Sequence, residues 1–412
     1  MKADILVLGA GIVGTSVALH LARRGRSVVL VDRRGPGEET SYGNSGVVGR
    51  SGLTPMAFPR SPKALARIVR QRYPGAHYHP AALPGLAPWL LAYWRASEPS
   101  RMLESAVRLA PLTAASVAEH RDLAAEAGAE HLYRDGGWMK VYRSAGAFAA
   151  ARRALDLAHA HGIDVAALDA GETAAAEPHL KPVFAGATLW NGVRSVSDPG
   201  GVVRALAAVL PGLGAAFATG DARTLRADGH GWCVDGAGGP IAGREAVVAL
   251  GPWSAEVLSP LGYRIPLAAK RGYHRHYAAK GNATLSRPVL DEERGYVMSP
   301  MALGIRVTTG SEFARPDAPP TPVQLDAAER DARELFPLDA PREATPWMGA
   351  RPCLPDMLPV IGRAPRHKGL WLAFGHQHNG FTLGPPTGRL LAEMMTGETP
   401  FVDPAPFRAE RF

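Results

Sequence analysis

The strongest constraint on the fold is a glycine-rich turn that joins two apolar segments near the start of the chain. The segment Asp4 to Leu8 is apolar on both faces, which is typical of a strand buried inside a parallel sheet. It is followed by Gly9-Ala10-Gly11-Ile12-Val13-Gly14, then by a helical segment from Ser16 to Arg24 and a second apolar run from Ser27 to Val31. This order predicts the first βαβ unit of a Rossmann-like domain, and therefore an α/β fold.

The three glycines of the turn have separate physical roles. Gly9 lets the chain leave the strand sharply, Gly11 leaves room for a pyrophosphate, and Gly14 lets the helix pack closely on the sheet. The free N–H groups and the positive dipole end of the helix then face the phosphates. Asp32 lies eighteen residues after Gly14, where a carboxylate can accept hydrogen bonds from ribose hydroxyls.

We therefore expect this unit to bind the ADP half of a dinucleotide. The predicted contacts are Gly9, Ala10, Gly11, Ile12, Val13, Gly14, Asp32, Arg33 and Arg34. Asp32 argues against a 2′-phosphate on the ribose. The two arginines either contact the adenine side or face solvent.

The next segment distinguishes between dinucleotides. Residues 39–49 are dense in glycine and small polar side chains. This composition suits a backbone that runs beside a flavin and donates N–H and hydroxyl groups to it, although it also suits a solvent-exposed loop. We favour FAD over NAD. The expected contacts are Thr40, Ser41, Asn44, Ser45, Gly46 and Val47.

Residues 5–22 contain no Asp, Glu, Lys or Arg, and could be mistaken for a signal peptide or a membrane span. The spaced glycines, the preceding Asp4 and the second strand argue against both. We expect a cytoplasmic protein.

Composition excludes several other functions. The chain of 412 residues has room for two or three domains. Its net charge of +8 comes from scattered arginines, which suits a solvated surface or a mild attraction to membrane headgroups and gives no reason to expect nucleic-acid binding. Cys233 and Cys353 are far apart, so no disulfide framework is expected. His376 and His378 have no Cys or acidic partner nearby, so we expect no metal.

The rest of the chain alternates between helical and strand-like patterns. Helices are expected within 61–130 and at 148–161, 199–210 and 387–395. Strands are expected as a hairpin over 131–143 around Asp135-Gly136-Gly137, at 240–250, within 265–315 and at 370–374, with a proline-rich linker at 316–322. The strand at 240–250 ends in Gly251-Pro252-Trp253, and open α/β sheets hold ligands at such strand ends.

Taken together, the motifs resemble the FAD-dependent oxidoreductases of the D-amino-acid oxidase type. Within that group the chain is most similar to bacterial D-amino-acid dehydrogenases and D-hydroxyproline dehydrogenases. The resemblance spans nearly the whole chain. It rests on Gly9 to Asp32, Thr40 to Gly46, Ala249 to Ser254, Gly349-Ala350-Arg351-Pro352, Pro359 to Arg363, Gly375-His376, Asn379-Gly380 and Gly384 to Gly388.

The resemblance implies two domains built from interleaved segments. An FAD-binding domain would comprise residues 1–60, 145–262 and 347–412. A substrate cap of antiparallel sheet and helices would comprise residues 61–144 and 263–346. The flavin ring would lie between the two domains, with N–H groups of the C-terminal loop facing its pyrimidine side.

The resemblance also implies the site. Arg351 would bind the substrate carboxylate, and Tyr273 and Tyr296 would lie near the substrate. His378 stands where some oxidase relatives carry a second arginine, which counts against a glycine or sarcosine substrate. Cofactor contacts are implied for Gly251, Trp253, Gly349, Arg351, His376, Asn379, Gly380, Phe381 and Thr382. A few relatives attach the flavin through a cysteine in this region, but we expect Cys353 to be a buried thiol and FAD to be bound non-covalently.

The implied activity is oxidation of a D-amino acid or a cyclic D-imino acid such as hydroxy-D-proline, by hydride transfer to FAD. Electrons would pass to a quinone or another carrier, and the protein would be cytoplasmic or peripheral on the inner face of the membrane. A peroxide-forming oxidase and the flavin subunit of a hetero-oligomer stay open as alternatives, as do the oligomeric state and the identity of the amino acid.

Overall fold

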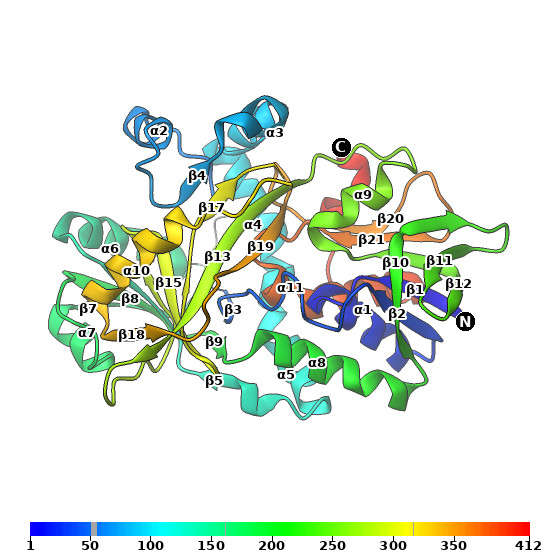
Figure 1. The fold of residues 1–412 in the computed structure, drawn as a ribbon, viewed down its shortest axis with the longest axis horizontal. Coiled ribbons are helices and arrows are strands. Elements are labelled where there is room, and N and C mark those ends of the chain that lie inside the picture. Colours follow the sequence, from blue (N-terminus) through cyan, green and yellow to red (C-terminus); the bar gives the residue numbers. More distant parts are fainter. Residues whose placement is uncertain (51–55, 161, 316) are drawn as a thin grey trace.

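The structure is a computed structural model that describes residues 1–50, 56–160, 162–315 and 317–412. Two sheets lie side by side, each with its own helices (Figure 1). We call them the cofactor domain, which contains both chain termini, and the cap. The mixed α/β class and the separate, largely antiparallel cap sheet confirm the fold predicted from the sequence.

The cofactor domain is built on a seven-stranded sheet. Its parallel centre has the order β21 (Leu370–Phe374), β12 (Gly239–Val248), β1 (Lys2–Leu8), β2 (Val28–Asp32) and β10 (Ala216–Ala227). β20 (Val360–Arg363) adds antiparallel to β21, and β11 (Trp232–Gly236) joins β10 to β12. The centre of the sheet is buried on both faces, which explains the continuous apolar runs in the sequence.

Two helices cover one face of this sheet in unusually close contact. α1 (Ile12–Arg23) packs on α11 (Gly380–Thr396) because glycines face the contact. A Cβ atom at Gly384 would lie 2.8 Å from a side-chain carbon of Ile12, and one at Gly388 would lie 2.6 Å from the carbonyl carbon of Ser16. Gly384 and Gly388 therefore allow the close packing of α11 on α1.

Both helices begin earlier than the sequence pattern predicts. α1 begins at Ile12 instead of Ser16, directly after the Gly11 cap, and α11 begins at Gly380 instead of Thr387. The prediction for α11 was wrong because Pro385 and Pro386 usually stop a helix, whereas here they lie inside its second turn.

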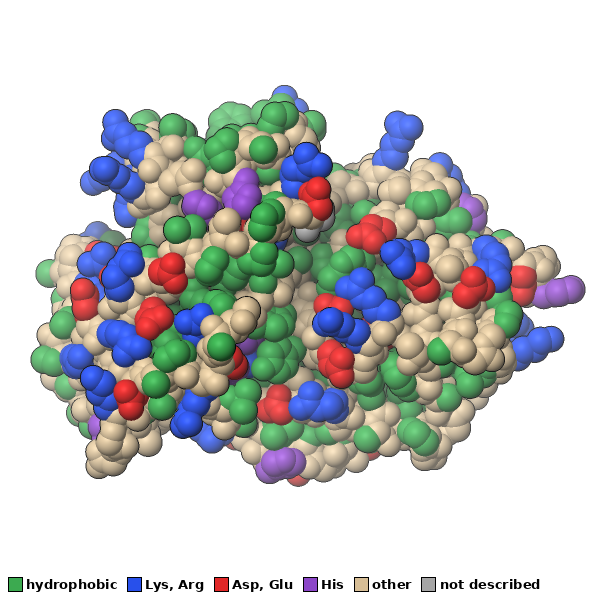
Figure 2. Space-filling view, in the orientation of Figure 1, with side chains coloured by type: hydrophobic (Ala, Val, Ile, Leu, Met, Phe, Trp, Pro, Cys, Tyr) green, Lys and Arg blue, Asp and Glu red, His purple; other side chains and the backbone are tan. Residues whose placement is uncertain are grey.

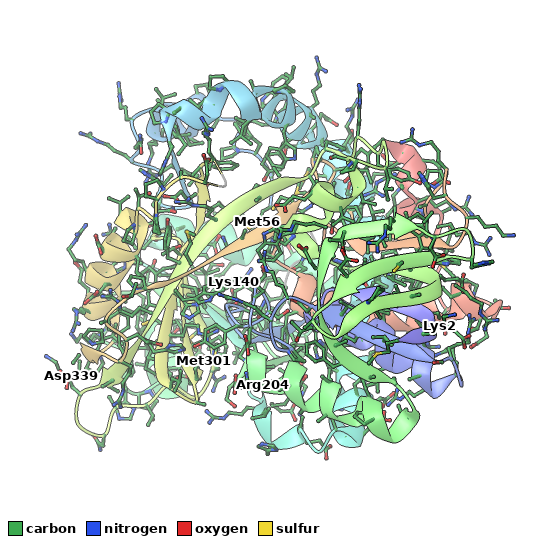
Figure 3. All side chains as sticks on the ribbon, turned by 45° about the vertical axis from the view of Figure 1, so that its right-hand side comes forward. Lys2, Met56, Lys140, Arg204, Met301 and Asp339 are labelled. Atoms are coloured by element: carbon green, nitrogen blue, oxygen red, sulfur yellow. The ribbon has the colours of Figure 1, made fainter. Side chains whose placement is uncertain are left out.

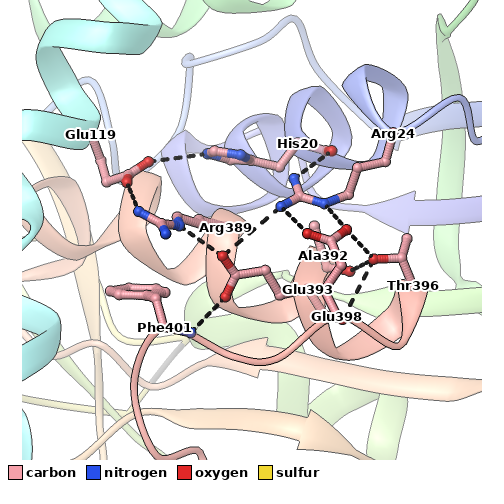
Figure 4. Close-up of polar contacts among 9 residues, drawn as sticks. All are labelled: His20, Arg24, Glu119, Arg389, Ala392, Glu393, Thr396, Glu398 and Phe401. Carbon is pink, nitrogen blue, oxygen red and sulfur yellow. Dashed lines mark hydrogen bonds and ion pairs between the residues drawn. The ribbon is translucent and has the colours of Figure 1, made fainter.

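A polar network joins α1 and α11 to α5 (Ser116–Glu126) and to the C-terminal tail (Figure 4). Buried Glu119 and Glu393 both accept hydrogen bonds from Arg389, and Arg24 pairs with Glu398. His20 lies 3.6 Å from Glu119, but burial and the neighbouring arginines lower its pKa to about 3. That histidine is therefore neutral, and its contact with the carboxylate is not an ion pair.

The cap sheet has eleven strands, with the long strand β13 (Ala268–Ala279) at its centre. β13 pairs antiparallel with β16 (Gly304–Thr308) through its second half and with β19 (Trp347–Cys353) through its first half. The predicted antiparallel strands within 265–315 are therefore confirmed. α10 (Val323–Leu335) packs on this sheet, and the apolar core beneath it includes Tyr273, Tyr277 and Tyr296.

The remaining elements complete the two domains. The helices are α2 (Pro62–Val69), α3 (Leu83–Ala96), α4 (Pro99–Ala114), α6 (Ala145–Ala160), α7 (Ala170–Ala176), α8 (Pro199–Val209) and α9 (Ser254–Leu258). The strands are β3 (Val47–Gly49), β4 (Ala76–Tyr78), β5 (Tyr133–Asp135), β6 (Trp138–Tyr142), β7 (Val165–Asp169), β8 (Gly186–Trp190), β9 (Val193–Val196), β14 (Val289–Asp291), β15 (Tyr296–Met301), β17 (Ser311–Phe313) and β18 (Leu338–Pro341). Within the described ranges, no helix is long and apolar enough to cross a bilayer.

The predicted hairpin over 131–143 is wrong. β5 pairs with β9 in a small three-stranded sheet, whereas β6 pairs with β8 and β14 in the cap sheet. Gly137, with φ of +76°, turns the chain from one sheet to the other. A glycine turn between two short strands does not by itself determine which partners the strands take.

The expected domain boundaries also need correction at three places. β7 and β8, assigned to the FAD-binding domain, belong to the cap sheet, as does β19. In contrast, α4 and α5 were assigned to the cap but pack on α11 in the core of the cofactor domain. The sequence pattern predicts which face of each helix or strand is buried, but it does not predict which sheet the element joins.

Candidate functional site

One large cavity lies between the two domains. It encloses about 1370 Å³, counting its open mouth, and reaches from Asp32 to His378. Figure 2 shows a hollow with an apolar floor between the two halves of the molecule. The cavity is lined by residues of both domains, and it is open to solvent.

The glycine turn forms the phosphate end of the cavity. Gly9 has φ of +107°, and a Cβ atom there would lie 2.5 Å from the carbonyl oxygen of Ala249. Gly11 is the N-cap of α1 and lines the cavity with Ile12 and Val13. No side chain stands between the first turn of α1 and the cavity at Gly11, which is the arrangement that a pyrophosphate requires.

Two members of the motif act behind this surface. The Ala10 N–H donates to Asp32 Oδ2 at 2.6 Å and is therefore already paired within the protein. A Cβ atom at Gly14 would lie 1.8 Å from the carbonyl oxygen of Gly9, so this glycine allows α1 to start directly against the turn. Neither residue lines the cavity. The structure thus gives both a packing role.

Asp32, Arg33 and Trp253 line the end of the cavity at which the sequence predicts the ribose and adenine. Burial raises the pKa of Asp32, while N–H donors from Ala10 and Arg34 partly oppose that shift. The Arg33 guanidinium lies 4.5 Å from the centre of the Trp253 ring, and both line the cavity. The Arg34 side chain is exposed and does not line the cavity, so solvent is the better of its two expected environments.

The small polar segment follows the cavity for part of its length. Thr40, Ser41 and Asn44 line it. The Ser41 hydroxyl accepts from the Ile12 N–H at 2.9 Å, so it caps the phosphate turn, and the Thr40 hydroxyl donates to the Ala350 carbonyl at 3.0 Å.

Ser45, Gly46 and Val47, the other contacts expected in this segment, do not line the cavity. Ser45 accepts through its carbonyl from Ser299, Gly46 donates to the Asn44 side chain, and Val47 begins β3. The fully buried Arg306 donates to the carbonyls of Tyr42 and Asn44, and so fixes the loop from the cap side.

The N-terminus of α11 forms another wall. Gly380 and Phe381 line the cavity, whereas Asn379 and Thr382 do not. The Thr382 hydroxyl donates to the Val47 carbonyl at 3.1 Å and so joins the start of the helix to β3. The first N–H groups of a helix lack internal partners and favour negative charge.

Arg351 occupies the wall formed by β13 and β19. Its Nη1 donates to the Gly310 carbonyl at 2.8 Å and its Nη2 to the Thr309 carbonyl at 3.1 Å. No Asp or Glu pairs with it anywhere in the described part of the chain. Lys270, directly opposite on β13, likewise has no acidic partner there, and its ammonium group lies among the rings of Trp89, Tyr93 and Phe313.

These cations set the electrostatics of the inner end. The His378 side chain faces the cavity beside Arg351. The side chain is exposed to the open cavity, but desolvation by the surrounding walls and the positive charges of Arg351, Lys270 and Lys140 lower the pKa of His378 to about 4. Lys140, labelled near the middle of the view in Figure 3, is a partly exposed residue of β6. The inner end of the cavity is therefore positively charged and holds a neutral imidazole, which favours an anionic ligand.

The tyrosines differ from expectation. Tyr273 lines the cavity, but its hydroxyl donates to Glu312 at 2.7 Å and accepts from Arg271 at 3.0 Å. The hydroxyl is thus committed to a buried ion pair. Tyr296 does not line the cavity. It lies in the cap core, where its hydroxyl is 3.4 Å from Asp291, so its placement near the substrate is corrected.

Glu312 also lies near two histidines, one in β4 and one directly after it. His77, His79 and Glu312 could together hold a metal ion by distance alone. The carboxylate, however, already pairs with Arg271 at 2.6 Å and accepts from Tyr273. These bonds explain the buried carboxylate without a metal.

Sequence reasoning missed several cavity residues. Trp347 is the largest: a Cβ atom at Gly43 or Gly349 would overlap its ring, which also stacks on His274 at 4.7 Å. Gln377 lines the cavity with φ of +58°, an uncommon backbone conformation for this residue type. Other missed lining residues are Glu39, Gly220 to Arg223, Glu256, Gly272 and Thr308. Gly43 and Gly349, which leave room for the Trp347 ring, could have signalled this residue, whereas no pattern in β10 signalled the residues that line the cavity there.

His376 and Gly251 are further residues that the sequence analysis predicts as cofactor contacts. Both line the cavity, with Gly349 beside Trp347. His376 Nε2 lies 3.0 Å from the Thr387 hydroxyl, and burial lowers the pKa of His376 to about 3. The ring is therefore neutral and bonded to α11.

Comparison with known proteins decides the family. The profile of the DAO family, described as FAD dependent oxidoreductase, matches residues 4–394. This chain belongs to that family. It is an FAD-dependent oxidoreductase, and the resemblance identified from the sequence motifs is confirmed.

Relatives span the whole length of the chain. A D-amino acid dehydrogenase of Cereibacter sphaeroides is 30% identical over 99% of this chain and 95% of the relative. A D-amino-acid oxidase of Bradyrhizobium diazoefficiens is 31% identical over 99% of this chain and 98% of the relative. Glycine oxidase from Geobacillus kaustophilus shares the fold, with a TM-score of 0.75 at 24% identity over 100% of this chain and 99% of that one.

The residues present fit the FAD that the family binds. Gly11 leaves the space that a pyrophosphate needs, Asp32 can supply acceptors for ribose, and the N-terminus of α11 can supply donors at the inner end. Gly9 serves the turn, because a Cβ atom there would lie 2.5 Å from the carbonyl oxygen of Ala249.

Proposed function

We propose that this protein is an FAD-dependent dehydrogenase of D-amino acids, or of cyclic D-imino acids such as hydroxy-D-proline. The observation that carries the proposal is Arg351, a partly exposed cation in the cavity wall with no acidic partner in the described part of the chain. A partly desolvated guanidinium without a carboxylate partner favours an anionic ligand. An amino-acid carboxylate supplies that charge, and the D-amino-acid oxidoreductases among the relatives support this substrate class.

Arg351 would orient the substrate. Nη1 and Nη2 each use a donor on a backbone carbonyl, which fixes the guanidinium plane and leaves further N–H groups for a carboxylate. FAD, when bound, supplies the acceptor for the hydride that leaves the substrate Cα. The neutral amine is the reacting form, so no side-chain general base is required. Holding the carboxylate in one orientation fixes Cα relative to the reacting face.

His378 would close the substrate end as a neutral group. Its low pKa keeps it uncharged at pH 7, so it adds no second cation beside Arg351. Gln377 and Gly272 stand with it in the cavity wall. We assign His378 the role of shaping the pocket and donating or accepting a single hydrogen bond to the substrate.

The proposal includes non-covalent FAD. Burial raises the pKa of the Cys353 thiol, which therefore stays protonated and a poor nucleophile. Cys353 also does not line the cavity, although Pro352 does.

We propose a membrane quinone as electron acceptor, reached by peripheral contact. Residues 40–97 contain seven Lys or Arg and no Asp or Glu. Within this stretch α3 exposes an apolar stripe that includes Leu91 and Trp94, which are 47% and 40% exposed, and Arg60 lies over the Trp94 ring. Apolar side chains with basic neighbours suit an anionic bilayer.

Leu91→Glu should lower the fraction of the protein that sediments with anionic vesicles. It should not change the rate at which the substrate reduces the flavin. Equal binding to zwitterionic vesicles would count against the charge argument.

The decisive experiment is anaerobic mixing of the yellow protein with D- and L-amino acids, including proline and hydroxyproline isomers. Bleaching by one class of D-isomers is expected. Arg351→Met should lower kcat/KM by about 10²–10³, because the lost charge-assisted hydrogen bonds are each worth about 1.5–3 kcal/mol. Arg351→Lys should have a kcat/KM between that of the wild type and that of Arg351→Met. Failure of every amino acid to bleach the flavin would overturn the proposal, and rapid peroxide formation in air would favour an oxidase. Activity only on addition of partner chains would favour a hetero-oligomer.

A further inference from the structure

Two prolines inside α11 leave two backbone carbonyls without their usual partners. In a helix, each carbonyl accepts from the N–H four residues later. Pro385 and Pro386 have no N–H, so the carbonyls of Phe381 and Thr382 cannot be paired in this way. Phe381 lies in the first turn of α11, at the cavity wall.

His120 on α5 takes the place of the missing donor. Its Nε2 lies 2.9 Å from the Phe381 carbonyl oxygen and its Nδ1 lies 2.8 Å from the Tyr133 hydroxyl. Because a carbonyl oxygen can only accept, the proton must reside on Nε2, and Tyr133 must donate to Nδ1. The two rings of His120 and Phe381 also stack, with centroids 5.5 Å apart and planes at 24°.

The charge state of His120 suits this role. The side chain is 1% exposed, and burial lowers its pKa to about 4. A neutral ring gives one donor and one acceptor, and both are used. No charge is introduced behind the helix, so the effect on the cavity passes through the hydrogen bond.

The Phe381 carbonyl and the Thr382 N–H belong to the same peptide unit. A hydrogen bond to the carbonyl polarises this unit and strengthens its N–H as a donor. That N–H is one of the first in α11, which have no partners within the helix. It directly follows Phe381, which lines the cavity, although Thr382 itself does not. We propose that His120 is a positioning residue for the flavin: it restores the polarity of the first turn of α11 and thereby favours the reduced, more negative cofactor. This rests on the proposed position of the pyrimidine edge of the flavin at this helix start.

A buried histidine with both nitrogens satisfied could serve packing alone, and the test must separate these roles. His120→Leu removes the donor, His120→Gln keeps one, and Tyr133→Phe removes a hydrogen bond of the same cluster while leaving the Nε2 donor. His120→Met is a second variant without a donor, in case the leucine variant does not fold. The readouts are the midpoint potential of the bound flavin without substrate, the Kd for FAD and Tm.

We expect His120→Leu or His120→Met to weaken binding of reduced relative to oxidised flavin by about 3- to 10-fold, where tenfold corresponds to about 30 mV for a two-electron couple. His120→Gln should recover most of this shift. Tyr133→Phe should lower Tm but leave the potential near the wild-type value. An unchanged potential in the leucine and methionine variants, with Tm lowered, would overturn the proposal. So would an equal shift in Tyr133→Phe. Because these measurements use no amino acid, a flavoprotein inactive with every amino acid would refute the proposed function and still test His120.

Discussion

Substitution of Gly388 by alanine tests the close packing of α11 on α1. A Cβ atom there would lie 2.6 Å from the carbonyl carbon of Ser16 and 2.7 Å from its oxygen, whereas ordinary contacts begin at 3.4 Å. Both atoms are helix backbone, so the helices must separate by about 0.8 Å, the difference between the first and last of these distances. Overpacking of this kind costs about 1–3 kcal/mol. Alanine recovers about 0.5–1 kcal/mol in helix propensity.

We therefore expect Gly388→Ala to destabilise the cofactor domain by about 1 kcal/mol, the difference between the midpoints of these two ranges. A domain of 150–250 residues loses about 2–4 °C in Tm for each kcal/mol. The Kd for FAD should also rise, because α1 carries the phosphate-binding N–H groups. Gly146→Ala is the matched control: it lies in α6 with no heavy atom within 4 Å of the new Cβ, so Tm should stay or rise. A Gly388→Ala variant as stable as the wild type and with unchanged FAD affinity would refute this account.

Three further predictions concern charge and pH. The buried His20, His120 and His376 have folded pKa values of about 3, 4 and 3, below the unfolded value of 6.5. The unfolded chain therefore binds more protons below pH 6.5, and each histidine should cost about 2 kcal/mol of stability at pH 5. Urea titrations at pH 7 and pH 5 measure this loss, and equal midpoints would contradict it. Glu393→Leu should lower Tm by several degrees, since it leaves buried donors unpaired at a cost of about 3 kcal/mol, whereas Glu393→Gln should lower it less. Asp32→Asn should stabilise the apoprotein at pH 7, because burial raises the pKa of this carboxyl and its ionised form is costly, yet weaken FAD about tenfold. Calorimetry of apo and loaded protein separates the two effects, and a less stable apoprotein would show the sign to be wrong.

The sequence predicted the site best where local geometry and chemistry coincide. Gly9, Gly11 and Asp32 all reach the cavity, because a strand–turn–helix unit fixes their positions over a few residues. Arg351 could be placed only through the family resemblance. Its freedom from acidic partners depends on strands from distant parts of the chain.

The tyrosines show why the remaining placements failed. Tyr273 and Tyr296 both lie on cap strands, and alternation along a strand predicts only which of two faces each occupies. The Tyr273 hydroxyl donates a hydrogen bond to Glu312 on another strand, and Tyr296 lies in the cap core. No local pattern records these partners.

The sequence by itself determined the cofactor class, the family and the alternation of buried strands and helices. Each of these depends on short segments of the chain, and backbone geometry fixes the spacing of residues within such a segment. Only the tertiary structure decided which sheet each strand joins, where α11 begins, and which cations remain unpaired around the cavity. The start of α11 shows the physical reason. Pro385 and Pro386 should end a helix, but a donor from His120, which is remote in sequence, compensates for one missing hydrogen bond. Long-range contacts of this kind exist only after the chain has folded.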